Sequence, residues 1–266
     1  SALVNNTTAN NNTAVGHNTL ASNTTGTNNI AIGSFALDAN TTANANTAVG
    51  VSSLTQNTTG TLNTAVGKGA LQNCTTADRN TAVGNEACDA QTTATKNTGI
   101  GYQALGAAST GSFNTAVGSD ALHSITTGDS NSGLGQNALG STTTGDQNVG
   151  IGVDALVSNT TGDYNVAVGT LSLKSNTSGY NNVAVGRLAM EDNVSGILNV
   201  VIGDMAFDEA TNRNYNVHVG AQAGRGGGAH NNVSVGYRAL GNAATTSAGD
   251  DNVAIGVQAL EDCTSG

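Results

Sequence analysis

The residues that could perform chemistry are few in this chain, and they share no spacing. Its four histidines are His17, His123, His218 and His230, and no cysteine or carboxylate recurs at a fixed distance from them. A metal centre needs three or four such ligands held together, and a general acid or base needs a partner within hydrogen-bond reach. We therefore expect no catalytic site, no cofactor and no histidine metal site.

The cysteines and glutamates lead to the same expectation. Cys74 and Cys263 fall at the same place in the repeat described below, Cys88 replaces a core leucine, and none belongs to a Cys-x-x-Cys motif. We expect free thiols rather than a disulfide framework. Hydrolysis of a polysaccharide would need two carboxylates facing a groove. No spacing pairs the three candidate glutamates, which are Glu86, Glu191 and Glu209.

Three aspartates do recur at a fixed spacing. The sequence "TTGD" places Asp129, Asp146 and Asp163 one repeat apart from each other. Carboxylate oxygens are preferred calcium ligands, but the Gly-Gly-x-Gly-x-Asp repeat of calcium-binding β-rolls is absent. These aspartates are weak candidates for an ion site, and a solvent-facing row is the simpler interpretation.

Basic residues gather between positions 213 and 238, although the chain holds only eight Lys and Arg in all. The cluster consists of Arg213, His218, Arg225, His230 and Arg238. It coincides with the part of the chain in which the spacing of the repeat changes. We therefore predict that these five residues form an interaction patch.

The elements that position all these residues are set by an internal repeat. A glycine stands at every seventeenth position from Gly16 to Gly220. The next glycine, Gly236, comes one position early, and Gly256 comes three positions late. A fixed period of this kind indicates an array of stacked units. We divide the chain into a regular solenoid over residues 1–220 and an irregular continuation of the same solenoid over residues 221–266.

An asparagine stands four positions before every one of these glycines. Stacked one coil above another at strand spacing, such side chains can form a ladder in which each carbonyl accepts from the next amide. The ladder residues in the first half of the chain are Asn29, Asn46, Asn63, Asn80, Asn97 and Asn114.

The three residues between that asparagine and the glycine have the alternation of a short strand. The first is Thr or Val in most copies and the third is Val, Ile or Leu, so both side chains point to one face. The middle residue, Ala or Gly in most copies, points to the other face. We interpret this small column as either a cramped interior or a subunit contact, and favour the contact. An Ala-Leu pair and a polar turn complete each unit. The repeat predicts an all-β fold, a parallel β-solenoid of about fifteen coils with one repeat in each.

Each coil has little apolar surface to bury, because it holds one or two large aliphatic side chains and some alanine. Hydrogen-bond ladders and burial between subunits must then offset the entropy lost on ordering the chain. We expect an oligomer, most of all a homotrimer.

Composition limits the partners. The formal charge of −10 opposes binding to nucleic acid, whose affinity comes mainly from Lys and Arg on phosphates. No apolar run long enough to span a bilayer occurs, so we expect no membrane insertion.

The motif "NTAVGKGAL", followed by "TT" and a small residue, resembles the repeats of bacteriophage tail fibres. It is also similar to the β-roll heads of trimeric autotransporter adhesins, which have a somewhat shorter period. The resemblance implies an extracellular trimeric fibre, part of a virion or a cell-surface appendage, that spaces and displays surfaces binding a cell-surface glycan or receptor. Both ends fall inside the repeat, so we expect a segment of a longer fibre.

Two alternatives come from the threonines and aspartates. Paired threonines such as Thr24 and Thr25 or Thr160 and Thr161 could order water on a flat face, which suggests an ice-binding β-solenoid. Adjacent residues of a strand point to opposite faces, however, so the pairs cannot form one double row. The aspartate row suggests a calcium-binding β-solenoid in the same way.

Overall fold

The computed structural model confirms the all-β solenoid. It describes residues 1–209, 211–226, 229–241 and 249–261. Over these ranges the secondary structure consists of short parallel strands joined by turns. None of the described segments is a helix with the length and apolarity needed to cross a bilayer.

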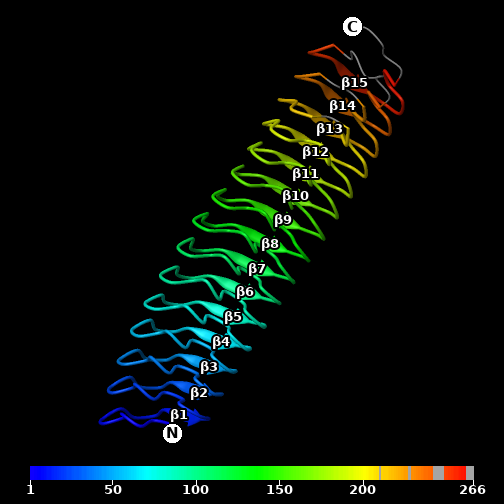
Figure 1. Cartoon of the computed structure of the whole chain (residues 1–266). Coiled ribbons are helices and arrows are strands. Elements are labelled where there is room, and N and C mark those ends of the chain that lie inside the picture. The colour runs from blue at the N-terminus through cyan, green and yellow to red at the C-terminus, as the bar shows by residue number, and fades with distance from the viewer. Residues whose placement is uncertain (210, 227–228, 242–248, 262–266) are drawn as a thin grey trace. The chain divides into compact units, whose positions relative to one another are not determined.

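The chain divides into two compact units, and each is described by itself. Unit 1 comprises residues 1–130. Its strands are stacked in chain order (Figure 1). They are β1 (Thr13–Val15), β2 (Ile30–Ile32), β3 (Thr47–Val49), β4 (Thr64–Val66), β5 (Thr81–Val83), β6 (Thr98–Ile100) and β7 (Thr115–Val117).

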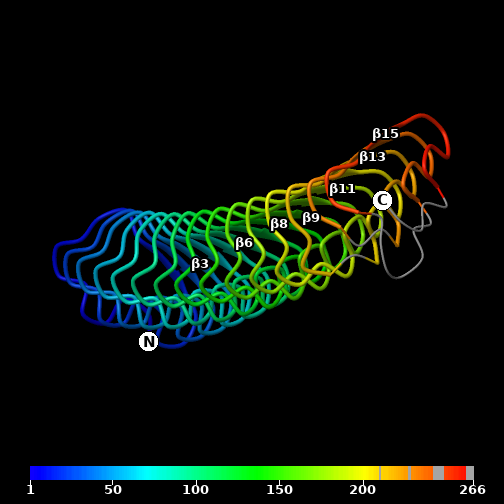
Figure 2. The ribbon, with the colours of Figure 1, turned by 90° about the horizontal axis from the view of Figure 1, so that it is seen from above.

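Unit 2 comprises residues 131–266, of which the described part holds the strands β8 to β15. Its coils also follow one another in chain order, as the view from above shows (Figure 2). The strands are β8 (Ser132–Leu134), β9 (Val149–Ile151), β10 (Val166–Val168), β11 (Val183–Val185), β12 (Val200–Ile202), β13 (Val217–Val219), β14 (Val233–Val235) and β15 (Val253–Ile255).

The strand register is kept even where the repeat length changes. In unit 1, Thr47 pairs with Thr64 and Thr64 with Thr81, one repeat apart. In unit 2, Val217 pairs with Val233 across the short step, and Val233 pairs with Val253 across the long step. The change in length therefore falls outside the strands, and the same strand side chains continue to face inward.

The corner after each strand requires glycine. At Gly67, φ is +137°, and an added Cβ would lie 2.2 Å from the carbonyl oxygen of Gly84 in the next coil. Neither the backbone angle nor the space allows a side chain there.

Further positions in every coil adopt the left-handed conformation, and most of them are not glycine. They include the leucine of the Ala-Leu pair, for example Leu71 at φ 51° and Leu173 at φ 50°. No such residue in the described part of the chain is Val, Ile or Thr, although Thr is abundant elsewhere. A branched Cβ makes this conformation more costly, which explains why the repeat has Ala-Leu and not Ala-Ile.

The interior of each coil is narrow and lined by small residues. The middle residue of every strand from β2 to β15 is buried within the single chain, as is the Leu column from Leu20 to Leu240. Our preference for the small column as a subunit contact is therefore wrong. The space at the middle position is tight, because even a Cβ on Gly150 would lie 3.1 Å from the Leu139 side chain.

Candidate functional site

The buried asparagine column connects every coil to the next. The backbone N–H of Asn46 donates to the Oδ1 atom of Asn29 over 3.0 Å, and the Nδ2 atom of Asn46 donates to the carbonyl of Gly60 over 2.8 Å. The same pattern holds at Asn63, Asn80 and Asn97. At Asn63 a direct amide-to-carbonyl contact of 3.2 Å to Asn46 is added. Each of these side chains therefore satisfies two backbone groups, and some also donate to the neighbouring asparagine.

A second asparagine ladder lies in the turn, and sequence reasoning missed it. Asn40 donates from Nδ2 to the Oδ1 atom of Asn23 over 2.9 Å, and Asn176 does the same to Asn159 over 2.9 Å. The sequence "NTT" predicts only a polar turn, but its asparagine is buried. The recurrence of asparagine at this one place in the repeat was the available signal.

The second ladder is interrupted over five coils. The residues in its place are Cys74, Gln91, Ala108, Ile125 and Thr142. The Gln91 carboxamide and the Thr142 hydroxyl are buried without a hydrogen-bond partner. Because a buried unsatisfied polar group is destabilising, we expect the turns to be weakest over this interval.

The two threonines of each turn have different roles. The first hydroxyl bonds the next coil, as when Thr58 Oγ1 donates to the carbonyl of Thr75 over 3.1 Å. The second threonine, such as Thr59 or Thr76, is exposed. The pairs do not form a double row.

The aspartate column supports the backbone of adjacent coils. The Oδ1 atom of Asp163 accepts the backbone N–H of Asp146 over 2.8 Å, and Asp129 accepts that of Ser112 over 2.6 Å. Asn44 and Asn214 occupy the same place and accept in the same way. No cluster of three metal-ligating side chains occurs among the described residues. These contacts give the aspartates a structural role that needs no ion.

The five residues of the predicted interaction patch lie in different surroundings. His230 occupies the aspartate column, where its Nδ1 atom accepts the backbone N–H of Asn214 over 3.1 Å. The Arg213 carbonyl accepts from Asn199 over 2.7 Å, while its Nε atom is buried without a hydrogen-bond partner. His218 is 2% exposed and so is not part of any surface.

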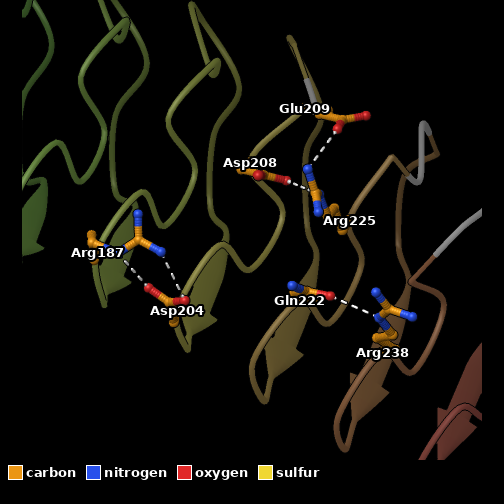
Figure 3. Close-up of polar contacts among 7 residues, drawn as sticks. All are labelled: Arg187, Asp204, Asp208, Glu209, Gln222, Arg225 and Arg238. Carbon is orange, nitrogen blue, oxygen red and sulfur yellow. Dashed lines mark hydrogen bonds and ion pairs between the residues drawn. The ribbon is translucent and has the colours of Figure 1, made fainter.

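The other two arginines are held by side chains of neighbouring coils (Figure 3). Arg225 pairs with Asp208 over 3.4 Å and with Glu209 over 3.3 Å. Arg238 donates to Gln222 over 2.7 Å and pairs with Glu261 over 3.3 Å. Burial raises the pKa of the Asp208 carboxyl, and the Arg225 guanidinium offsets part of that rise. These arginines connect coils in the same way as the Arg187–Asp204 pair does, over 2.9 Å.

His218 takes the place of an alanine inside the coil. Its ring lies 4.4 Å from the ring of Phe207, and its Nδ1 atom is 2.7 Å from the Ser234 hydroxyl. Its Nε2 atom is buried without a partner. Phe207 and Gly224 occupy Leu positions beside it, and a Cβ on Gly224 would lie 2.6 Å from the imidazole. Burial lowers the pKa of the imidazole to about 4, so the ring is neutral at physiological pH.

The remaining candidate nucleophiles and carboxylates have structural surroundings. Burial raises the pKa of the Cys74 thiol to about 12 and also raises that of Cys88, so both stay protonated. Cys263 lies outside the described residues. Glu86 accepts from Gln103 over 3.0 Å, and Glu191 pairs with Lys174 over 3.0 Å.

The outward face of the strands is the main apolar surface, and it differs between the units. In unit 1 the first outward column is threonine except for Ile30, and the second is Val or Ile. The hydroxyls of Thr47, Thr64 and Thr81 have no partner among the described residues, in contrast to those of the turn. In unit 2 both columns are aliphatic, with Ser132 the one exception among the described strands.

Side chains at the corners on either side of the strands are exposed and vary from coil to coil. Several are aromatic: Tyr102, Phe113, Tyr164, Tyr180, Tyr215 and Tyr237. Aromatic side chains present an apolar face with, in tyrosine, a polar tip.

Comparison with models of known protein families found no match, and comparison with curated proteins found no related sequence.

Proposed function

We propose that this chain is a structural segment of an extracellular attachment fibre, in a virion or a cell-surface appendage. It acts as a homotrimer that spaces and displays binding surfaces for a cell-surface glycan or receptor. The observation that carries the proposal is the contrast between inside and outside. Interior columns keep asparagine, a small residue or leucine in most coils, and the asparagines satisfy the backbone of the next coil, while the exposed corners vary freely.

This contrast suits a shaft better than a catalyst. Identical coils extend a structure without limit, because each contacts only its neighbours. The variable corners can then change without disturbing the ladders. The exposed aromatics Tyr102 and Phe113 of unit 1, 52% and 53% exposed, are suited to stacking on sugar rings.

The proposal is tested by the mass in solution and by glycan binding. We expect sedimentation equilibrium to give three times the mass of one chain, which is 26.2 kDa. We expect binding on an array of cell-surface glycans to weaken when Tyr102 and Phe113 are changed to Ala. A monomer with no glycan binding would overturn the proposal.

Ice binding is a second candidate function. The candidate surface is the outward strand face of unit 1 and not the threonine pairs of the turns. There Thr47, Thr64, Thr81 and Thr98 alternate with aliphatic residues, and their hydroxyls have no partner within the described part of the chain. Such a row repeats hydroxyl and methyl groups at about 4.8 Å, the spacing of strands, and presents a fixed pattern to water.

Thermal hysteresis distinguishes this candidate. The double variant Thr64→Lys and Thr81→Lys should abolish hysteresis. The matched variant Thr59→Lys and Thr76→Lys, in exposed turn positions, should leave it unchanged. Absence of hysteresis in the unmodified chain would eliminate ice binding.

A further inference from the structure

We propose that copies of this chain contact one another through the outward strand face of unit 2. This face, called here the aliphatic face, consists of the first and third residues of β9 to β15. The inference rests on the proposed self-association and says which surface makes it.

The aliphatic face ranges from half-buried to exposed in the single chain: the outward side chains of β10 and β11 are half-buried, while those of β12 and β15 are exposed. Ile151 is 38% exposed, Val200 37% and Ile202 41%. Every outward residue of these strands is Val or Ile. Parallel sheets are normally covered on both faces, and a contiguous exposed apolar surface marks a contact site.

In some coils the corners extend the apolar surface on either side of the strands, while in others the same positions are polar or charged. Tyr164, Leu198 and Tyr215 stand two positions before the first outward valine of their coils, and all three are exposed. Val153 and Tyr237 stand two positions after the second outward residue and are exposed as well. Enrichment in tyrosine and a more apolar composition are typical of the centre of an interface.

The size is sufficient for a specific contact. Seven strands at about 4.8 Å span roughly 34 Å, and the three residues of a strand with one corner side chain on each side, at about 3.3 Å each, span roughly 17 Å. Each copy therefore offers on the order of 600 Å², close to the roughly 800 Å² per partner of a standard interface.

Charge and period point to a second copy as the occupant. The chain is acidic overall, but no outward position of β9 to β15 is charged. Two copies can therefore meet along the strands without opposing carboxylates, and at the corners beside them Asp204 is paired with Arg187 over 2.9 Å. A partner must also present apolar groups at the spacing between neighbouring coils, along the whole length of this face. Another copy of this chain does so because its own strands have the same spacing.

Unit 1 supplies the control within the same molecule. Its first outward column is threonine at every strand except β2, in the same strand position as the valines of unit 2. Threonine is therefore compatible with the coil at that place. A Val→Thr change in unit 2 removes apolar surface while keeping the shape of the side chain.

The experiment compares three proteins by sedimentation over a range of concentrations. The first is the unmodified chain. The second carries Val166→Thr, Val183→Thr, Val200→Thr and Val217→Thr, together with Val168→Lys and Val185→Lys. The third carries Thr161→Lys and Ser178→Lys, which place the same two charges at exposed turn positions of the neighbouring coils. Circular dichroism checks that all three are folded.

We expect the second protein to dissociate with a constant raised at least about tenfold, and the third to match the unmodified chain. If the unmodified chain is an oligomer and the second protein has the same dissociation constant, the aliphatic face is not the contact surface. The fibre proposal would remain intact. A folded monomer in every case would overturn both. If the lysines prevent folding, the protein with the four Val→Thr changes alone decides between these results.

Discussion

Unit 1 and unit 2 build the same coil and expose different surfaces. In both, the interior consists of asparagine, alanine and leucine columns, and the strands pair in register. The outward face is mixed Thr and Val in unit 1 and aliphatic in unit 2. The difference teaches that the interior columns specify the fold, while the outward columns are free to specify contacts.

The largest expected effect tests whether the interiors are equivalent. Gly67→Ala in unit 1 and Gly186→Ala in unit 2 each place a Cβ within 2.3 Å of a carbonyl oxygen in the next coil. Each should destabilise its coils by about 3 kcal/mol or more. Hydrogen exchange of the amides around each site measures the loss.

Gly69→Ala is the matched control, because there the nearest atom is the flexible Gln72 side chain at 3.2 Å. It should cost less than about 1 kcal/mol. A large effect in one unit and none in the other would show that the interiors are not equivalent.

The second prediction concerns His218, the buried histidine of the interior. The ordinary pKa of 6.5 falls to about 4 at His218 in the folded chain. Between these values the unfolded chain binds a proton that the folded chain does not. The free energy of unfolding should therefore decrease by about 3 kcal/mol as the pH falls from 6.5 to about 4.

Hydrogen exchange in β12 to β14 at several pH values measures this effect, and His218→Ala should remove that part of the pH dependence. The coils of unit 1, whose strand interiors hold only Ala and Gly, provide the internal reference. An equal pH dependence in the variant would assign the effect to other groups.

The third prediction tests the left-handed leucines in both units. Leu71→Ile and Leu173→Ile keep the volume but place a branched Cβ at a φ of 51° and 50°. Each should cost about 2 kcal/mol in thermal or denaturant unfolding. Leu→Met at the same places should cost less than about 1.5 kcal/mol, since Met190 already occupies this column. Equal costs for Ile and Met would refute the backbone explanation.

The smallest predicted effect repairs the interrupted ladder. Gln91 is buried with both carboxamide atoms unsatisfied. Gln91→Asn shortens the side chain to the length that bonds the carbonyl three positions on, as Asn57 does to Gly60 over 3.0 Å. We expect a gain of about 1 kcal/mol in stability. A loss would mean that the longer residue fills space that asparagine leaves empty.

The fold was predictable because the period fixes every coil at once. The glycine corner, the asparagine column and the alternation of "TAV" each have one physical interpretation in a strand-and-turn coil. The sequence could not predict whether the small middle residue of each strand points inward or outward. The alternation of side chains along a strand separates two faces without showing which of them is buried. The second ladder was missed because Asn and Thr are also ordinary turn residues. The predicted interaction patch was wrong for His218, whose side chain is buried. Its closeness in sequence to the arginines did not reveal that this position faces the interior of the coil.

The strands keep their register whether the step between them is regular, one position shorter or three positions longer, which has a genetic consequence. A duplication or deletion of one whole repeat in the gene leaves every remaining coil with the same kind of neighbour above and below. Small changes in length are tolerated between the leucine column and the next asparagine, where the short and long steps fall, and are harmful between the asparagine and the glycine. Copy number can therefore drift between related genes while the coil itself stays fixed.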